Sequence, residues 1–272
     1  MRFTTTLAAA LAVAAFASWS YATPIFLQDY EAPGGLDEPF NRSPDASGSS
    51  EGILDDDAPN DPGTSAIALD AADGTLGTTQ SALITIVDEA PPAADSAGAN
   101  GTAYSIRLIP NAGANVTATN PAFPTDGFVG FYLKADPTAA AALLEVAPLL
   151  EDSGGTLAGS GGVLKPVIAD GLWHLYEWDM DNPADFPNTF ETFYGGTPAA
   201  ETLEATASFD SIAIISRGID GQSSASLKID QIGYDNAGRL PQPPIIPEPA
   251  SVVLAACGML GVGLALQRRA VR

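Results

Sequence analysis

The chain has 272 residues, and its 33 acidic and 11 basic side chains give a formal net charge of −22 at pH 7. This surplus of negative charge argues against nucleic acid and anionic polysaccharide as direct ligands, because neither contributes cations. The single cysteine, Cys257, and the single histidine, His174, exclude a Cys/His zinc site and a Cys–His nucleophile pair. A Ser–His–Asp set would depend on His174 alone.

The first 22 residues have the three parts of a secretory signal peptide. Arg2 is followed by an apolar run over residues 7–17, and Ser20-Tyr21-Ala22 has the small-residue pattern of a cleavage site. We therefore predict a signal helix over residues 1–22, cleavage between Ala22 and Thr23, and export of the remainder. Export permits disulfides, but no cysteine lies between residues 23 and 246, so stability must come from the core.

Residues 23–240 are predicted to form the exported domain. Short apolar or β-branched segments with a period of two alternate there with turns rich in Gly, Pro, Asp and Asn. This spacing predicts an all-β fold, a single jelly-roll-like β-sandwich. Residues 31–63 are predicted to form a long surface loop. Strands are expected within residues 23–30, 65–71, 80–87, 104–109, 127–135, 163–168, 170–180, 209–217 and 226–234.

Residues 138–150 allow two interpretations. Their alanines and leucines favour a helix, but Pro148 interrupts it because proline lacks the backbone donor and clashes with the preceding turn. The alternative is a strand that begins near Leu143. In a chain that is otherwise predicted to be all β, we favour the strand.

The most distinctive internal segment is DGLWHLYEWDM, residues 170–180. Asp-Gly predicts a turn, and in the strand that follows Trp173 and Leu175 share one face while His174, Tyr176 and Trp178 share the other. Exposed aromatic rings beside polar groups are suited to sugars. Because the two tryptophans alternate, we expect at least one of them to belong to the core.

An enzymatic function is the less favoured hypothesis. Glycoside hydrolysis needs two carboxylates about 5 to 10 Å apart. Glu177 and Asp179 lie beside aromatic residues, but nearby carboxylates are common in so acidic a chain. The sequence has no Gly-x-Ser-x-Gly elbow, no phosphate-binding loop and no His-Glu-x-x-His. We therefore expect no catalysis.

The C-terminal end combines a proline-rich stalk, an apolar run and a basic tail. Residues 241–249 contain five prolines, which keep the backbone extended. The uncharged run over residues 250–266 would span roughly 25 Å as a helix, at the short end for a membrane. Arg268 and Arg269 follow it and would stay on the cytoplasmic side. We predict a transmembrane helix and basic tail over residues 250–272.

Pro247-Glu248-Pro249, the apolar helix and Arg268-Arg269, in this order, resemble the PEP-CTERM sorting signal, here residues 247–272. The resemblance implies a bacterial precursor tethered to the inner membrane and processed near the motif by an exosortase, an integral-membrane transpeptidase. The product would go to the envelope, surface or extracellular matrix, where such proteins are linked to exopolysaccharide and biofilm. The other interpretation is a permanent anchor with a proline-rich stalk.

The middle of the chain resembles the galactose-binding-like jelly roll of carbohydrate-binding modules, through DGLWHLYEWDMD, DSIAIISR and LKIDQIGYDN. The resemblance implies a structural calcium ion (Ca2+) between the first and last strands, at Asp29, Glu31 and Asp230. It also implies sugar binding by exposed aromatic residues, for which the candidates are Trp173, Tyr176 and Trp178.

The sequence therefore supports three functional hypotheses. The first is a non-catalytic structural component of the cell surface or matrix, associated with exopolysaccharide. The second is a glycan-binding module that uses surface aromatic residues. The third, least favoured, is a polysaccharide hydrolase or lyase that uses Glu177.

Overall fold

The structure is a computed structural model, and its description of the chain covers seven ranges. They are residues 23–31, 66–87, 102–107, 122–152, 159–189, 203–216 and 224–243. Within them, none of the helices is long and apolar enough to cross a membrane. The predicted signal helix over 1–22, with Ala22, lies outside the described residues. So do Pro247, Glu248, Pro249, Arg268 and Arg269, together with the predicted transmembrane helix.

The first sheet has six antiparallel strands. Strand β13 lies near its middle and pairs with β6 on one side and with β3 and β1 on the other. The order is β10-β6-β13-β3-β2, with β1 paired to β13. The strands are β1 (Ile25–Gln28), β2 (Ala66–Asp70), β3 (Ser81–Val87), β6 (Phe128–Ala135), β10 (Trp173–Asp179) and β13 (Ser224–Asp235).

The second sheet has seven strands in the order β11-β8-β7-β12-β4, with β5 paired to β12 and β9 to β7. Its longest strand, β12, pairs along its length with β7. The strands are β4 (Thr102–Arg107), β5 (Ala122–Pro124), β7 (Leu144–Asp152), β8 (Gly159–Gly161), β9 (Lys165–Pro166), β11 (Asn188–Thr189) and β12 (Thr206–Ser216).

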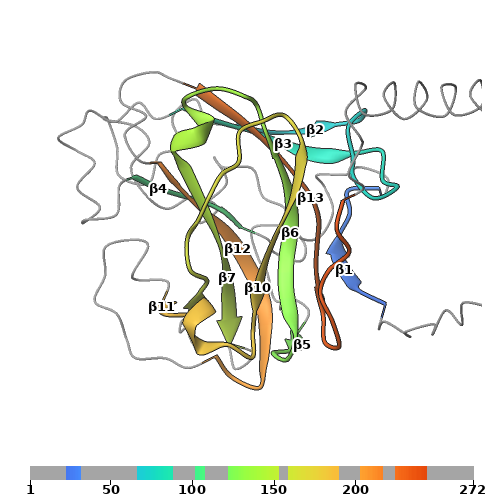
Figure 1. The fold of residues 1–272 in the computed structure, drawn as a ribbon, viewed down its shortest axis with the longest axis vertical. Helices are drawn as coiled ribbons and strands as arrows, with labels where there is room; N and C mark the ends of the chain where they lie inside the picture. Colours follow the sequence, from blue (N-terminus) through green and yellow to red (C-terminus); the bar gives the residue numbers. More distant parts are fainter. Residues whose placement is uncertain are drawn as a thin grey trace, which may run out of the picture.

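The two sheets pack face to face around one apolar core, with β7 and β12 to the left of β6 and β13 in Figure 1. Where the strands are regular, alternate residues point inward, as a period of two requires. The Phe131 ring of β6 lies 6.1 Å from the Tyr176 ring and 5.5 Å from the Trp178 ring of β10, measured between centroids. The β-sandwich prediction is thereby confirmed for the described residues.

The ambiguous segment is a strand. One turn of 3-10 helix, η3 (Ala141–Leu143), precedes β7, which runs from Leu144 through Pro148 and pairs with β12 on one side. The Pro148 carbonyl accepts a hydrogen bond from the backbone of Gly162 at 2.9 Å. Gly162 suits this position because a Cβ there would lie 2.5 Å from the proline ring.

The structure differs locally from what the sequence predicts. The strand expected at 163–168 is only the two-residue β9, and β8 forms in the Gly-Ser-rich stretch before it. In β13 the register shifts between Asp230 and Gly233, where Gln231 has a φ of 46°. This bulge reverses the alternation of side chains. Ile232 therefore joins the core together with Leu227 and Ile229.

Candidate functional site

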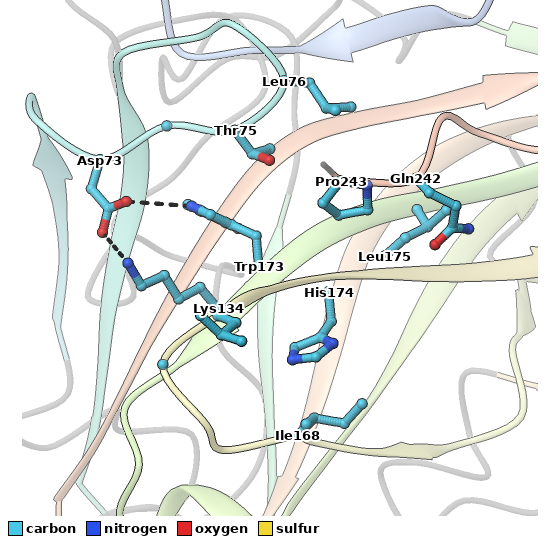
Figure 2. A pocket seen from close by; sticks show the side chains of 13 residues that line it. Asp73, Thr75, Leu76, Lys134, Ile168, Trp173, His174, Leu175, Gln242 and Pro243 are labelled. Atoms are coloured by element: carbon cyan, nitrogen blue, oxygen red, sulfur yellow. Dashed lines mark hydrogen bonds and ion pairs between the residues drawn. The ribbon is translucent and has the colours of Figure 1, made fainter. Parts of the chain in front are cut away.

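A pocket of about 590 Å³ lies on the face of the first sheet that is turned away from the core. Four stretches of the chain line it, and Figure 2 shows their side chains around one opening. They are the turn at 73–76, Lys134 of β6, the segment from Ile168 through Leu175, and residues 242–243.

The alternation of β10 places Trp173 at this pocket. Trp173 pairs with Lys134 of the neighbouring strand and is partly exposed, whereas Tyr176 and Trp178 are buried in the core. The turn before β10 includes Gly171, whose φ of 78° favours glycine. The strand therefore begins with a tryptophan whose ring faces the pocket.

Asp73 fixes the Trp173 ring and neutralises two lysines. One Asp73 oxygen lies 3.3 Å from the indole Nε1 of Trp173, and the other lies 2.8 Å from Lys134 and 2.5 Å from Lys228. Lys228 also pairs with Asp70 at 2.7 Å. Burial acts to raise the pKa of Asp73, but the two lysines outweigh it and hold that pKa below its ordinary value.

The rim of the pocket exposes apolar side chains. Ile168 is 48% exposed and Leu172 is 60% exposed, and both line the opening. Leu76, on the opposite turn, has a φ of 48°, a left-handed conformation that is uncommon for a leucine. Such strain is found preferentially where surrounding structure holds a residue at a binding site.

Gln242 brings a polar group to the opening beside Trp173, whereas the alternation of β10 turns the His174 ring to the other side of the strand, where it lines the pocket near Ile168. His174 Nε2 lies 2.9 Å from Oδ1 of Asp170 and 3.0 Å from its Oδ2. Burial acts to raise the pKa of Asp170, but the hydrogen bond with His174 outweighs the effect of burial. The pKa of Asp170 is therefore below its ordinary value. The pocket therefore combines one aromatic ring and an apolar rim with several hydrogen-bonding groups.

The chain crosses the outer face of the first sheet after β13. We call residues 236–243 the strap. Glu177, buried at 6% exposure, forms an ion pair with Arg239 and accepts a hydrogen bond from the backbone of Leu240 at 3.2 Å. The Tyr132 hydroxyl donates to the Pro241 carbonyl. These contacts bring the end of the strap to the pocket.

The structure separates the three predicted aromatic ligands of sugar. Trp173 lies at the pocket, whereas Tyr176 and Trp178 are buried in the core, so their rings are not exposed for stacking on a sugar. The Tyr176 hydroxyl accepts from Ile168 N at 2.8 Å, and Trp178 Nε1 donates to the Val163 carbonyl at 2.7 Å. Their polar atoms thus tie the core to the neighbouring loop.

The predicted calcium ligands do not gather into one site. Asp29 is exposed and accepts from the backbone of Glu31, while Glu31 accepts from Thr79 N at 2.5 Å and Gln80 N at 2.8 Å. Both oxygens of buried Asp230 also accept hydrogen bonds from the protein. No three or more His, Cys, Asp or Glu side chains of the described ranges are grouped to hold a metal. Glu31 and Asp230 do not fit as calcium ligands here, because N–H and O–H donors face both oxygens of each carboxylate.

Sequence reasoning missed Asp73, Lys134 and Gln242 as pocket residues. The sequence predicts only a turn at Asp73, and it places Gln242 only in a stalk. The partners Asp73 and Trp173 are 100 positions apart in the chain. No local motif links them, since the contact arises from the pairing of β2, β3, β13, β6 and β10 in one sheet.

Comparisons with known proteins do not place the chain in a family. No family model matches the chain, and no curated protein matches it. Among solved structures, the chain is similar to one from work on carbohydrate-binding modules of the β-sandwich superfamily, with 8% identity and a TM-score of 0.35. The likeness covers 63% of this chain and 53% of that one, so it spans about half of the other protein's length.

Proposed function

We propose that this is an exported, non-catalytic surface protein whose β-sandwich binds a neutral glycan in the pocket beside Trp173. The observation that carries the proposal is the Trp173 ring, fixed by Asp73 in a pocket with exposed Ile168 and Leu172 at its rim. The apolar face of a sugar ring packs on such a surface, and neighbouring polar groups bind its hydroxyls.

The charges around the pocket favour a neutral ligand. Lys134 and Lys228 are already paired with Asp73, and the whole chain carries a net charge of −22. An anionic polysaccharide would therefore meet no unpaired cation among these residues and would be repelled at longer range. The exposed Gln242 amide can instead exchange hydrogen bonds with hydroxyl groups.

The environment of Glu177 supports a non-catalytic function. Its carboxylate lies beneath the strap with Arg239, and Glu177 is not among the residues that line the pocket. A general acid or nucleophile must reach the substrate. As proposed, the protein holds a glycan without cleaving it.

The binding proposal is tested with the full-length protein in detergent and a panel of neutral gluco-, galacto- and mannohexaoses. We expect isothermal titration calorimetry to detect binding of at least one hexasaccharide. Trp173→Ala should weaken that binding about tenfold or more, because stacking on an aromatic ring is lost. Leu143→Ala is the matched control, since Leu143 is 42% exposed but lies outside the pocket lining. Equal affinity of the wild type and Trp173→Ala would contradict the proposal.

We also propose that the C-terminal segment is a sorting signal for an exosortase, with Pro247, Glu248 and Pro249 as the recognised motif. The order of motif, apolar run and Arg268-Arg269 supports it. Deleting residues 247–249 should leave export intact but block processing, so the full-length form accumulates in membranes. Replacing residues 244–246 with alanine is the control. Continued processing of the deletion variant would favour a permanent anchor or an ordinary protease.

A further inference from the structure

The strap supplies one wall of the pocket. Gln242 and Pro243 line the opening, and in Figure 2 they lie across from Asp73, with Trp173 between the two sides. The wall is thus built by the segment through which the sandwich leads to the predicted sorting signal. Pro247, the start of the predicted motif, follows only a few residues later in the chain.

One buried carboxylate holds this wall in place. Glu177 belongs to β10, the strand that also carries Trp173, and it binds both the Arg239 side chain and the Leu240 backbone of the strap. Leu240 is itself buried, and the Arg239 guanidinium lies 5.3 Å from the centre of the Phe128 ring. Removing the Glu177 charge would leave the strap without its main polar anchor.

A second anchor lies next to Gln242. Tyr132 of β6 is fully buried, and its hydroxyl donates to the carbonyl of Pro241. The prolines at 241 and 243 restrict the backbone on both sides of Gln242. Gln242 is therefore held in position before any ligand arrives, which lowers the entropic cost of binding.

We propose that the strap is part of the binding surface, with Gln242 as a ligand-contacting residue and Glu177 as a positioning residue that holds the strap against the sheet. This inference depends on the proposed glycan binding. A ligand that touches both β10 and the strap has a higher affinity for the protein with its strap against the sheet than for the protein with its strap released. By linkage, strap docking raises the affinity for the ligand, and the ligand raises the equilibrium constant for docking by the same factor.

Processing at the predicted motif would leave the pocket intact. Cleavage near Pro247 leaves Gln242 and Pro243 on the sandwich, so the processed product keeps a complete pocket. Truncation before Gln242 would remove a wall of the pocket while leaving β13, which ends at Asp235, in the sheet.

The test compares Gln242→Ala, Glu177→Gln and Trp173→Ala in the full-length protein, with the tightest-binding hexasaccharide of the neutral panel. We expect Gln242→Ala and Glu177→Gln each to weaken binding about 5- to 20-fold, because a ligand hydrogen bond or the placement of its donor is lost. Gln80→Ala is the control for Gln242→Ala, since Gln80 does not line the pocket.

Hydrogen exchange of the Leu240 amide gives a second readout that a purely structural effect would not produce. The saccharide should slow this exchange in the wild type and in Gln80→Ala, but not in Trp173→Ala. Glu177→Gln should exchange faster without ligand, because the amide loses its charged acceptor.

The two kinds of failure are distinguishable. If Trp173→Ala loses binding while Gln242→Ala and Glu177→Gln bind like the wild type, the strap is not part of the site and only this inference is overturned. Tighter binding by Gln242→Ala would also overturn it, because the strap would then obstruct the pocket. If the wild type binds no member of the panel, the proposed function fails and this inference fails with it.

Discussion

Asp230 is a buried carboxylate whose environment has a measurable consequence. It is fully buried on β13 and accepts hydrogen bonds from Thr75 N at 2.8 Å, Thr78 Oγ1 at 2.5 Å and Gln231 N at 2.7 Å. Burial nevertheless dominates these bonds and raises the pKa of Asp230 to about 6. The folded protein therefore keeps this carboxyl protonated at a pH where the unfolded chain does not.

The sign of the pH effect follows from this shift. Because the pKa of Asp230 is raised on folding, its contribution to stability is complete below about pH 4 and is lost as the pH rises through about 6. We expect Asp230→Asn, which cannot ionise, to lose less thermal stability than the wild type between about pH 4.5 and 7.5. The difference should be on the order of 2 kcal/mol in the free energy of unfolding.

The measurement is a series of melting curves across this pH range. Asp29→Asn is the control, since Asp29 is exposed at the end of β1. Parallel pH profiles for the wild type and Asp230→Asn would contradict the assignment. Repeating the melting curves with calcium present also tests the predicted calcium ion. A cation bound at Asp230 would favour its ionised form, so the stability of the wild type would fall less as the pH rises.

At the scale of elements, the pairing of β6 with β10 places the pocket, and it depends on a glycine. Gly130 lies opposite Glu177, and a Cβ at Gly130 would lie 2.2 Å from the Tyr176 carbonyl oxygen. Backbone atoms cannot yield as a side chain can, so Gly130→Ala must separate the two strands. We expect a loss of about 2 to 4 kcal/mol in the free energy of unfolding.

Denaturant unfolding measures this loss, with Gly77→Ala as the control. Gly77 has a φ of 99°, but a Cβ added there would have no atom within 4 Å, so its substitution adds conformational strain without a clash. The two variants therefore separate close strand approach from backbone strain. An equal or smaller loss for Gly130→Ala would show that β6 and β10 can move apart at little cost.

The strands were predictable from sequence where they contribute to the core. Apolar, β-branched and aromatic residues identified β3, β6, β10 and β12, because these residues pack between the two sheets. The bulge in β13 was not predictable, since it depends on a positive φ at Gln231, a residue with no special preference for it. Strand β8 was likewise not predictable, because its glycine and serine residues give no apolar alternation.

The site was only partly predictable for a different reason. Trp173 could be predicted as a candidate binding residue, because an aromatic residue in a strand beside a turn is recognisable from the local sequence. The contacts that complete the site join Trp173 to Asp73 and Glu177 to Arg239, and both depend on tertiary packing. Burial of Tyr176 and Trp178 also depends on which face of β10 meets the second sheet, which alternation alone does not determine.

At the scale of the whole molecule, stability and binding depend on different faces of the first sheet. The core between the sheets provides stability without a disulfide, and the outer face of the first sheet is left for the pocket and the strap. The strap continues toward the C-terminal segment that is proposed to sort the protein. The proposed pocket wall and the proposed sorting motif would therefore lie within one short segment, residues 241–249.

The central claim is that a neutral glycan binds at Trp173, and the indole N–H signals of the two sandwich tryptophans test it most directly. Trp173 Nε1 faces Asp73 at the pocket, whereas Trp178 Nε1 is bonded to the Val163 carbonyl on the core side. We predict that titrating the protein with the best neutral hexasaccharide shifts the Trp173 signal saturably and leaves the Trp178 signal in place. An unchanged Trp173 signal at saturating saccharide would contradict the account.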